Sequence, residues 1–462
     1  MTIDLRPMFS AMRAASRHDR LPDLAIRRRR LDTLKSMVVD NRKEIATAID
    51  ADFGGRVHEE TELTEILPLL SAINHTSRNL RGWMRDERRH VALTFQPGSA
   101  WVRHEPLGVV GIVAPWNYPL LLALGPVVDA LAAGNRVLIK PSELTPAFAD
   151  LLQSLVAASF ATDEVSVITG GVEVAQAFAA LPFDHLLFTG STDVGRKVMR
   201  AAAENLTPVT LELGGKSPAI IAHDYSLEDA ARSIALGKFT NAGQTCIAPD
   251  YVLVPTDKVD AFSRAMQARI AQSYPPESAA SQFTNVITDR HRKRLMDALE
   301  EVEQAGATMI QPPKADFGTK IPPTLVLGAP DDSLLLTEEI FGPILPIVPY
   351  NTLDDALAFV NRRSRPLALY AFSHDRHAQR IILDGAISGG VTLNGTLLHI
   401  AQNSLPFGGV GKSGIGAYHG RDGFRRLSHA RAVYKPHLLN LSEHLGPPFG
   451  SLAHWIIRLL GR

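Results

Sequence analysis

The sequence contains a single cysteine, Cys246, among its 462 residues. One cysteine cannot close an internal disulfide, which excludes a disulfide-stabilised scaffold and is compatible with a reducing compartment. The chain also lacks an excess of either charge, because 48 Lys and Arg residues balance 48 Asp and Glu residues. Nucleic-acid-binding domains usually carry a basic excess, so we expect no nucleic-acid partner.

Long apolar runs are absent as well. No segment approaches the ~20 apolar residues that a membrane-spanning helix needs, and residues 1–30 have no continuous apolar region typical of a signal peptide. These absences favour a cytoplasmic protein. The basic run Arg27–Arg30 lies where apolar residues recur at helical spacing, and we interpret it as a solvated helix face. The short C-terminal segment 452–462 is apolar and basic, which leaves a membrane-surface helix, a docking helix and a dimer contact open.

The length of the chain and the pattern of its apolar residues indicate at least two domains. A single hydrophobic core stops growing at roughly 250–300 residues, and a content of 45% hydrophobic and 21% charged residues is ordinary for a globular protein. Residues 1 to about 90 show amphipathic patterning that predicts mainly helices. There is no internal repeat and no low-complexity linker.

From residue 107 the pattern changes to short apolar runs that alternate with helical stretches. The runs end in Gly, Pro or Ser and lead into helices, which is typical of a parallel sheet with crossover helices. Two series of such runs predict two α/β domains: 108–115, 136–143, 166–171 and 185–192, then 217–222, 251–255, 322–327, 344–350 and 368–373. Ligands of these sheets bind beyond the carboxyl ends of the strands. We therefore expect a cleft where the two series meet, at the paired glycines of residues 210–218. Segments 101–108 and 428–436 flank the series and are expected to pair outside both sheets.

The glycine-rich segments give a weaker signal. The usual dinucleotide fingerprint G-x-G-x-x-G is absent after the first strand, and "GSTDVG", Gly190 to Gly195, instead joins an apolar run to a helical stretch. Such a junction offers free N–H groups and a positive dipole end to a phosphate, although a plain tight turn explains it equally. Two "GKS" sequences lack the first glycine of a P-loop, because Thr210 and Pro406 stand there, which excludes a P-loop NTPase.

Cys246 lies in "NAGQTC", among small and polar residues that form cores poorly. A lone cysteine is more often a buried hydrophobe than a nucleophile, and a nucleophilic thiol needs activation to the thiolate. Other segments offer the missing roles: Glu212 in "LELGG" as a general base and Asn117 in "APWNYP" as an oxyanion donor. Glu339 and Phe341 in "EIFGP" pair an acceptor for sugar hydroxyls with a ring for a flat heterocycle. Each has a structural alternative, respectively a salt-bridged carboxylate, an Asx-turn, and a turn beside a core phenylalanine.

Together these segments resemble the aldehyde dehydrogenase superfamily. "APWNYP", "KPSE", "FTGSTDVG", "LELGGKSP", "NAGQTC", "EEIFGP", "VTLN" and "PFGGVGKSG" occur in its order and spacing, and the resemblance spans residues 20 to 436. The details are similar to the shorter class 3-like branch and, within it, to bacterial coniferyl aldehyde dehydrogenases.

The resemblance implies an α/β fold with a Rossmann-like cofactor domain, an α/β catalytic domain and a small oligomerisation extension, assembled as a homodimer. The expected boundaries are 1–85 and 108–212 for the dinucleotide-binding domain, 213–424 for the catalytic domain, and 86–107 and 425–462 for the oligomerisation extension and C-terminal tail.

The resemblance also implies an activity, the NAD(P)-dependent oxidation of an aldehyde to a carboxylic acid through a cysteine thiohemiacetal and thioester. Cys246 matches the nucleophile, Glu212 the base and Asn117 the oxyanion donor. Coniferyl-type aromatic or medium- to long-chain aliphatic aldehydes are the expected substrates. The alternatives are an acylating, CoA-dependent enzyme, which a hydrolytic base at Glu212 argues against, and a non-catalytic cofactor-binding protein.

The implied cofactor is NAD, with NADP as the alternative, and no metal is expected. Glu143 would repel a 2′-phosphate by ~4 kcal/mol if the two were close and partly screened, which favours NAD. The residues implied to bind the cofactor are Trp116, Lys140, Glu143, Gly190, Ser191, Gly195, Glu339 and Phe341. Tyr118 and His399 are expected to contribute to the substrate pocket.

Overall fold

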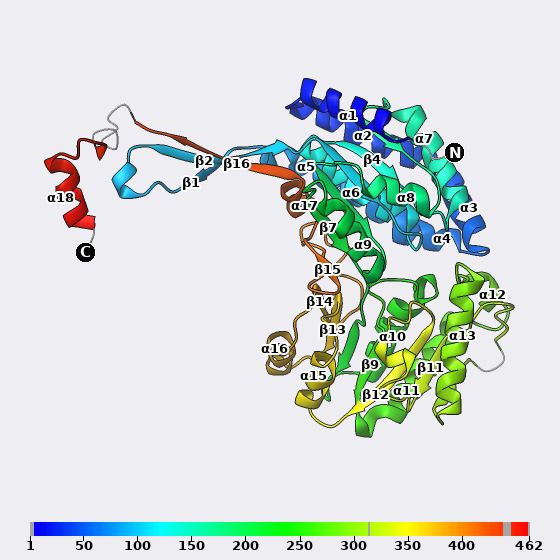
Figure 1. Cartoon of the computed structure of the whole chain (residues 1–462). Helices are drawn as coiled ribbons and strands as arrows, with labels where there is room; N and C mark the ends of the chain where they lie inside the picture. The colour runs from blue at the N-terminus through cyan, green and yellow to red at the C-terminus, as the bar shows by residue number, and fades with distance from the viewer. Residues whose placement is uncertain (1–3, 313–314, 438–444, 461–462) are drawn as a thin grey trace.

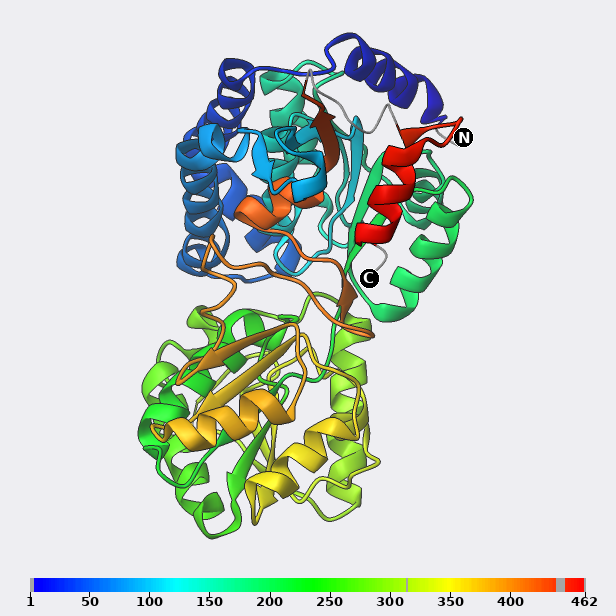
Figure 2. The same ribbon diagram turned by 90° about the vertical axis from the view of Figure 1, so that its left-hand side faces the viewer.

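The computed structural model describes residues 4–312, 315–437 and 445–460. Two α/β bodies lie one above the other, and a narrow ribbon projects from the first body and leads toward helix α18 (Ser451–Leu460) (Figures 1 and 2). The first body contains the N-terminal helices.

The N-terminal segment is helical, as predicted. The helices are α1 (Arg6–His18), α2 (Leu24–Asp40), α3 (Arg42–Phe53), α4 (His58–Thr61) and α5 (Leu67–Trp83), with a π-helical turn η1 (Glu62–Ile66) before α5. The solvated face predicted for the arginines of α2 is partly wrong. Arg27 and Arg30 are buried, because Arg27 donates to the carbonyl of Ala132, on the neighbouring helix α6 (Pro119–Ala133), and Arg30 pairs with Glu164 at 3.0 Å.

The first sheet has the strand order β15-β7-β6-β3-β4-β5. Its strands β3, β4, β5 and β6 are buried along their whole length, as expected for a parallel sheet covered by helices on both faces. The four runs of the first predicted series all form strands of this sheet. The bounds are β3 (Val109–Val113), β4 (Arg136–Lys140), β5 (Val165–Val167), β6 (His185–Thr189), β7 (Val209–Glu212) and β15 (Gly414–Ile415), with helices α6, α7 (Pro146–Ser159), α8 (Val172–Ala179) and α9 (Thr192–Ala203).

The second sheet has the order β10-β11-β12-β9-β8-β13-β14. It is parallel except at its edge, where β10 runs antiparallel to β11. Each run of the second predicted series forms one of its strands. The strands are β8 (Pro218–Ile221), β9 (Tyr251–Pro255), β10 (Thr308–Ile310), β11 (Thr324–Leu327), β12 (Ile344–Tyr350), β13 (Ala368–Phe372) and β14 (Gly390–Leu393). The helices include α10 (Leu227–Phe239), α11 (Val259–Ser273), α13 (Asp289–Gln304), α15 (Leu353–Asn361) and α16 (Arg376–Gly385).

The crossing between the bodies contains more structure than the glycine-rich bend predicted at 210–218. Residues 209–212 form β7 at the edge of the parallel strands, and the short strand β15 pairs with it antiparallel, with Gly414 opposite Glu212. Residues 414–415 thus return to the first sheet before position 424, the predicted end of the catalytic domain. Helix α17 (Gly420–Arg426) then packs on α5 and α6. The predicted boundaries as a whole remain a prediction.

The ribbon is a three-stranded antiparallel sheet outside both bodies, as predicted for its two long strands. Its order is β1 (Glu87–Arg89), β2 (Ser99–Pro106) and β16 (Ser428–Lys435), and β2 pairs with β16 from Pro106 opposite Ser428 to Ser99 opposite Lys435. Part of the predicted C-terminal tail, 438–444 and 461–462, lies outside the described residues. Within the described ranges, no helix is both long and apolar enough to cross a bilayer.

Candidate active site and cofactor cleft

The turn that carries Cys246 has an unusual backbone. Asn241, Ala242 and Gly243 all have positive φ, at 52°, 50° and 74°, a conformation that residues with a side chain rarely adopt. A Cβ on Gly243 would overlap the carbonyl of Gly342, so glycine is required by space as well. Strained backbone of this kind persists only where its surroundings determine it, and it concentrates at functional sites.

Two carboxyl groups lie close enough to Cys246 to affect its ionisation. Burial raises the pKa of the Cys246 thiol, and the nearby Glu339 and Glu212 raise it further. The N–H groups of Cys246 and Ile247 hydrogen-bond the sulfur and act in the opposite direction. These surroundings favour the protonated thiol, and formation of the thiolate needs a base or a nearby cation.

The two carboxyl groups are themselves held in unusual states. Both oxygens of Glu212 are buried and have no hydrogen-bond partner among the described residues, and burial raises the pKa of Glu212 well above its ordinary value. Burial, followed by the charge of Asp250, raises the pKa of Glu339 to about 8. The structure thus places Glu212 and Glu339 around the thiol, as the sequence predicted, in a desolvated environment that holds protons tightly.

Asn117 lies against the turn that carries Cys246. Its side-chain Nδ2 donates to the carbonyl of Gln244 at 3.0 Å, and its own carbonyl accepts from Asn241 Nδ2 at 2.9 Å. The next residue, Tyr118, shares a hydrogen bond of 2.7 Å with Thr245. Both predicted residues therefore contact the segment directly before Cys246. One N–H of the Asn117 amide is engaged by Gln244, which leaves the second for another acceptor.

His399 contacts Thr392 and Phe407, whereas Asn117 and Tyr118 contact the segment before Cys246. Its Nδ1 lies 2.9 Å from the hydroxyl of Thr392, and the ring stacks on Phe407 at 6.1 Å. A Cβ on Gly390 would approach Nε2 to 3.0 Å, so this edge of the ring faces strand β14. Burial lowers the pKa of His399 to about 4, so the ring is neutral. Its contribution to a substrate pocket remains a prediction.

The predicted adenosine contacts form an ion pair at the end of β4. Lys140 is buried, and its Nζ lies 2.8 Å from the half-exposed Glu143. The other predicted contacts to the cofactor's phosphates lie at the junction of β6 and α9. Ser191 is the N-cap of α9 and accepts from the N–H of Val194 at 3.4 Å. A Cβ on Gly195 would come within 2.7 Å of Leu213, so this glycine lets the helix approach the crossing segment closely.

Two aromatic residues stand where the sequence predicted a nicotinamide. The rings of Trp116 and Phe341 are 5.3 Å apart and nearly perpendicular, and Phe341 has a positive φ of 51°. Beside them, a Cβ on Gly214 would overlap the Glu339 carboxylate. One oxygen of Glu339 is buried without a partner among the described residues, and an unpartnered acceptor of this kind fits a ligand hydroxyl.

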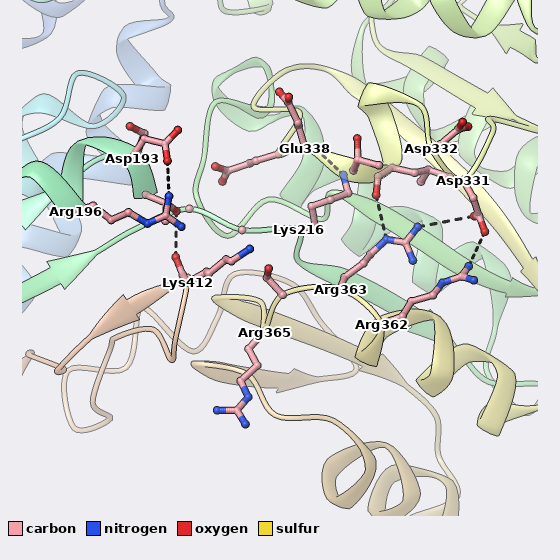
Figure 3. Close-up of a pocket in the computed structure, with 18 of the residues that line it drawn as sticks. Asp193, Arg196, Lys216, Asp331, Asp332, Glu338, Arg362, Arg363, Arg365 and Lys412 are labelled. Carbon is pink, nitrogen blue, oxygen red and sulfur yellow. Dashed lines mark hydrogen bonds and ion pairs between the residues drawn. The ribbon is translucent and has the colours of Figure 1, made fainter.

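A cavity of about 940 Å³ lies between the two bodies, and residues at the N-terminus of α9 and at the loop of Glu339 are among those that line it (Figure 3). Charged side chains line it, and most of them are paired with one another, as in the ion pairs of Arg196 with Asp193 and of Arg362 with Asp331. A helix N-terminus, a carboxyl group with one unpartnered oxygen and several cationic side chains line the same cavity, and this combination suits an anionic dinucleotide. The residues present therefore fit NAD(P), although the sequence missed most of the cationic side chains.

Sequence reasoning also missed a buried charge cluster beneath this site. Asp250 accepts from Lys216 Nζ and from the N–H of Ile340, and Lys238 Nζ lies 3.9 Å away. Lys216 donates further to the carbonyl of Glu338 at 2.8 Å. The cluster thus joins three motifs: the crossing segment, the segment that follows Cys246 and the loop of Glu339. The sequence signal that could have revealed the cluster is Asp250, a charged residue between the apolar residues that follow Cys246 and the apolar strand β9.

The geometry defines an α/β protein with a charged cavity between its two bodies and a buried cysteine near Glu339 and Glu212, and comparison with known proteins places it in a family. Residues 4–433 match the aldehyde dehydrogenase family. A probable coniferyl aldehyde dehydrogenase of Pseudomonas aeruginosa is 48% identical over 446 residues, which cover 96% of this chain and 94% of the relative. The dimeric NADP-preferring aldehyde dehydrogenase of Mus musculus is 40% identical over 420 residues, covering 90% and 91%.

Solved structures agree with this assignment. The substrate-bound state of Staphylococcus aureus AldH has a TM-score of 0.93 at 36% identity and covers all of both chains. An aldehyde dehydrogenase of Mycobacterium tuberculosis complexed with NAD+ has a TM-score of 0.82 at 31% identity, covering 92% of this chain and 88% of that one. The chain belongs to the aldehyde dehydrogenase family. It catalyses the NAD(P)-dependent oxidation of an aldehyde to a carboxylic acid.

Proposed function

We propose that Cys246, Glu212 and Asn117 carry out this oxidation and that the substrates are coniferyl-type aromatic aldehydes, with medium- to long-chain aliphatic aldehydes as the second class. An unpartnered carboxyl group near the thiol, and an amide donor that contacts the segment directly before Cys246, support the catalytic roles. The 48% identity to the Pseudomonas aeruginosa relative supports the aromatic substrate.

In the proposed mechanism, the Cys246 sulfur attacks the aldehyde carbon as the thiol proton leaves to solvent. The free N–H of the Asn117 amide and the N–H of Cys246 donate to the resulting oxyanion, and each such donor is worth roughly 3–4 kcal/mol in the transition state. NAD(P), when bound, supplies the acceptor for the hydride. The acyl group then remains on Cys246 as a thioester. Glu212 removes a proton from the water that attacks the thioester, and the acid is released.

The burial of Glu212 suits this second step. A carboxyl group with a raised pKa is a stronger base once it has lost its proton, and its two oxygens have no competing donor among the described residues. Hydrolysis by water at Glu212 also disfavours transfer of the acyl group to CoA. Analysis of the product with and without CoA checks this point, because acyl-CoA formed in place of free acid would contradict the hydrolytic role.

For the cofactor, we assign the adenosine ribose to Lys140 and Glu143, a phosphate contact to Ser191 at the N-terminus of α9, and the nicotinamide end to Glu339 and Phe341. The tight approaches at Gly190 and Gly195, and the position of Trp116 beside Phe341, support this assignment. With the dinucleotide-binding domain at 1–85 and 108–212 and the catalytic domain at 213–424, the proposed site lies at their junction: Asn117 and Glu212 come from the first domain, and Cys246 and Glu339 from the second.

We further propose a cytoplasmic homodimer in which 86–107 and 425–462 form the contact. The ribbon ends at β16, whose outer edge is unpaired within the described part of the chain, and an open edge is suited to pairing with another chain. The mouse relative is named dimeric. Light scattering of the purified protein tests the proposal, and a monomeric mass at micromolar concentration would contradict it.

The experiment that tests the function uses the single cysteine. Cys246→Ser is expected to abolish aldehyde oxidation while NAD(P) still binds. In the wild type, alkylation by iodoacetamide should abolish activity in proportion to label at one site per chain. A panel from acetaldehyde through decanal to coniferyl aldehyde then orders the substrates by kcat/KM. Turnover by the serine variant near the wild-type rate would reject the mechanism.

A further inference from the structure

The π-helical turn η1 brings two carboxylates to one side of the chain. The N–H of Leu67 bonds to the carbonyl of Glu62, five residues earlier, as in a π-helix. In an α-helix, residues five apart point about 140° away from each other. Glu60 and Glu65 are five apart, yet both approach the guanidinium of Arg56, at 3.8 Å and 3.0 Å. π-bulges often occur at functional sites, and this one brings Glu60 and Glu65 to the same arginine.

Arg56 joins the cluster to the loop of Asn117. Its side chain is fully buried, and Nη1 donates to the backbone carbonyl of Asn117 at 3.1 Å while it pairs with Glu65. Nη2 donates to the hydroxyl of Thr64 at 3.2 Å. The guanidinium also lies 5.0 Å from the ring centre of Tyr118. A planar guanidinium can donate hydrogen bonds in several fixed directions at once, which the single ammonium group of a lysine cannot do.

Glu65 holds the other side of the same loop. Its second oxygen accepts from the N–H groups of Leu120 and Leu121, at 2.8 Å and 3.0 Å. These groups belong to the first turn of α6, where N–H groups have no partner within the helix. Pro119 has no N–H to offer. Arg56 therefore hydrogen-bonds the start of the segment 117–121, and Glu65 hydrogen-bonds its end.

Glu60 extends the cluster to the turn that precedes Cys246. It accepts from the hydroxyl of Thr284 at 3.2 Å and from the backbone N–H of Asn241. Asn241 begins the run of positive φ angles, and its side chain donates to the carbonyl of Asn117. The cluster thus contacts both loops that the oxyanion would face.

We infer that Arg56 and Glu65 are positioning residues that fix the Asn117 amide relative to Cys246. The inference rests on the oxyanion role proposed for Asn117. A buried ion pair is weak evidence for stability, because the cost of desolvation offsets its attraction. A misplacement of 1 Å at a reacting group, in contrast, can cost about 100-fold in rate. The pair acts through the amide and does not touch the substrate.

A double-mutant cycle tests the inference, with kcat/KM for the aldehyde measured at saturating NAD(P). Asn117→Ala should lower it about 10²- to 10³-fold, and Arg56→Lys about 10- to 100-fold. The combined variant should be within about 3-fold of Asn117→Ala alone, because a missing amide cannot be misplaced. The dissociation constant of NAD(P) should not change. Arg30→Lys, at a buried Arg–Glu pair remote from the site, is the matched control and should stay within about 2-fold of wild type.

Glu65→Gln provides a second arm that retains the size of the side chain and an acceptor oxygen. It enters the same cycle, and it replaces Arg56→Lys if that variant does not fold. Multiplicative losses in the combined variant, or wild-type kcat/KM in both Arg56→Lys and Glu65→Gln, would overturn the inference and leave the proposed chemistry intact. Full activity of Asn117→Ala would instead overturn the oxyanion role, and the inference with it.

Discussion

Two glutamates to which we assign different roles, Glu143 for the cofactor and Glu212 for the chemistry, are held in opposite states. The Glu143 side chain is 42% exposed and pairs with Lys140 at 2.8 Å. Near the thiol, Glu212 is 3% exposed, and both of its oxygens lack a partner in the described structure. Partial burial opposes the ionisation of Glu143, but the hydrogen bond from Lys140 outweighs it, and the pKa lies below its ordinary value. Burial raises the pKa of Glu212 and of Glu339.

The difference in protonation between Glu143 and Glu212 matches the roles that we assign to them, cofactor binding for Glu143 and catalysis for Glu212. A carboxylate that is already charged and solvated can hold ribose hydroxyls without reorganising. A carboxyl group that is buried and neutral loses its proton only when a ligand, a cation or higher pH compensates the charge. Groups of the second kind mark acid–base sites. The glutamate assigned to the cofactor is therefore charged, and the one assigned to the reaction is neutral.

The largest effect is expected from removing the neutral partner of the thiol. Glu212→Gln should lower steady-state turnover about 10³-fold, in the range of general-base losses, while a first turnover of NAD(P)H still forms as a burst. Stopped-flow absorbance at 340 nm separates the two phases. Glu338→Gln, a more exposed carboxylate of the cavity between the two bodies, is the control and should be unaffected. A lost burst with normal hydrolysis would assign Glu212 to the first step instead.

A smaller effect is expected at Glu339, whose pKa is about 8. If its carboxylate accepts from the nicotinamide ribose, the KM for NAD(P) should fall several-fold as pH rises from 7 to 9. Glu339→Gln should have a KM that does not change with pH. Steady-state kinetics at fixed ionic strength measure this difference. An unchanged pH profile in the variant would assign the titration to another group.

The raised pKa of Glu339 also predicts how the folding stability of the protein changes with pH. The folded pKa of Glu339 lies above the ordinary value of 4.5, so the folded state binds the proton more tightly than the unfolded chain does. Its contribution to stability is therefore lost as pH rises from 4.5 through 8. Glu339→Gln should raise the melting temperature at pH 8.5 and leave it nearly unchanged at pH 4.5. Equal shifts at both pH values would contradict this account.

The smallest effect is expected at the charged glutamate, Glu143. Glu143→Gln should raise the ratio of kcat/KM for NADP to that for NAD about 5-fold, because solvent screens the repulsion of a half-exposed carboxylate. Asp163→Asn is the matched control, since Asp163 is similarly exposed and pairs with the buried Arg136. Kinetics with both cofactors decide the question. A ratio that stays constant would remove Glu143 from the discrimination.

The sequence predicted most strands of both sheets because apolar runs that end in Gly, Pro or Ser are a local signal, but it missed β7, β10, β14 and β15. The resemblance to the aldehyde dehydrogenase superfamily implied a site of Cys246, Glu212 and Asn117, and the structure places Glu212 near the thiol and Asn117 against the segment before it. The sequence did not predict Arg56 or Asp250, whose roles depend on loops distant in sequence. Nor did it predict that Arg27 would be buried, since helical periodicity does not reveal what covers each face.

The pairing of β15 with β7 bears on how the protein is made. Gly414 lies opposite Glu212, and Leu213 donates to the carbonyl of Ser413 at 3.1 Å. This contact closes a loop of about 200 residues, and long loops close late in folding. During synthesis, residues 414–415 must leave the ribosome before β15 can pair with the segment of Glu212. A product truncated before β15 would therefore carry Cys246 but would lack this pairing at the segment of Glu212.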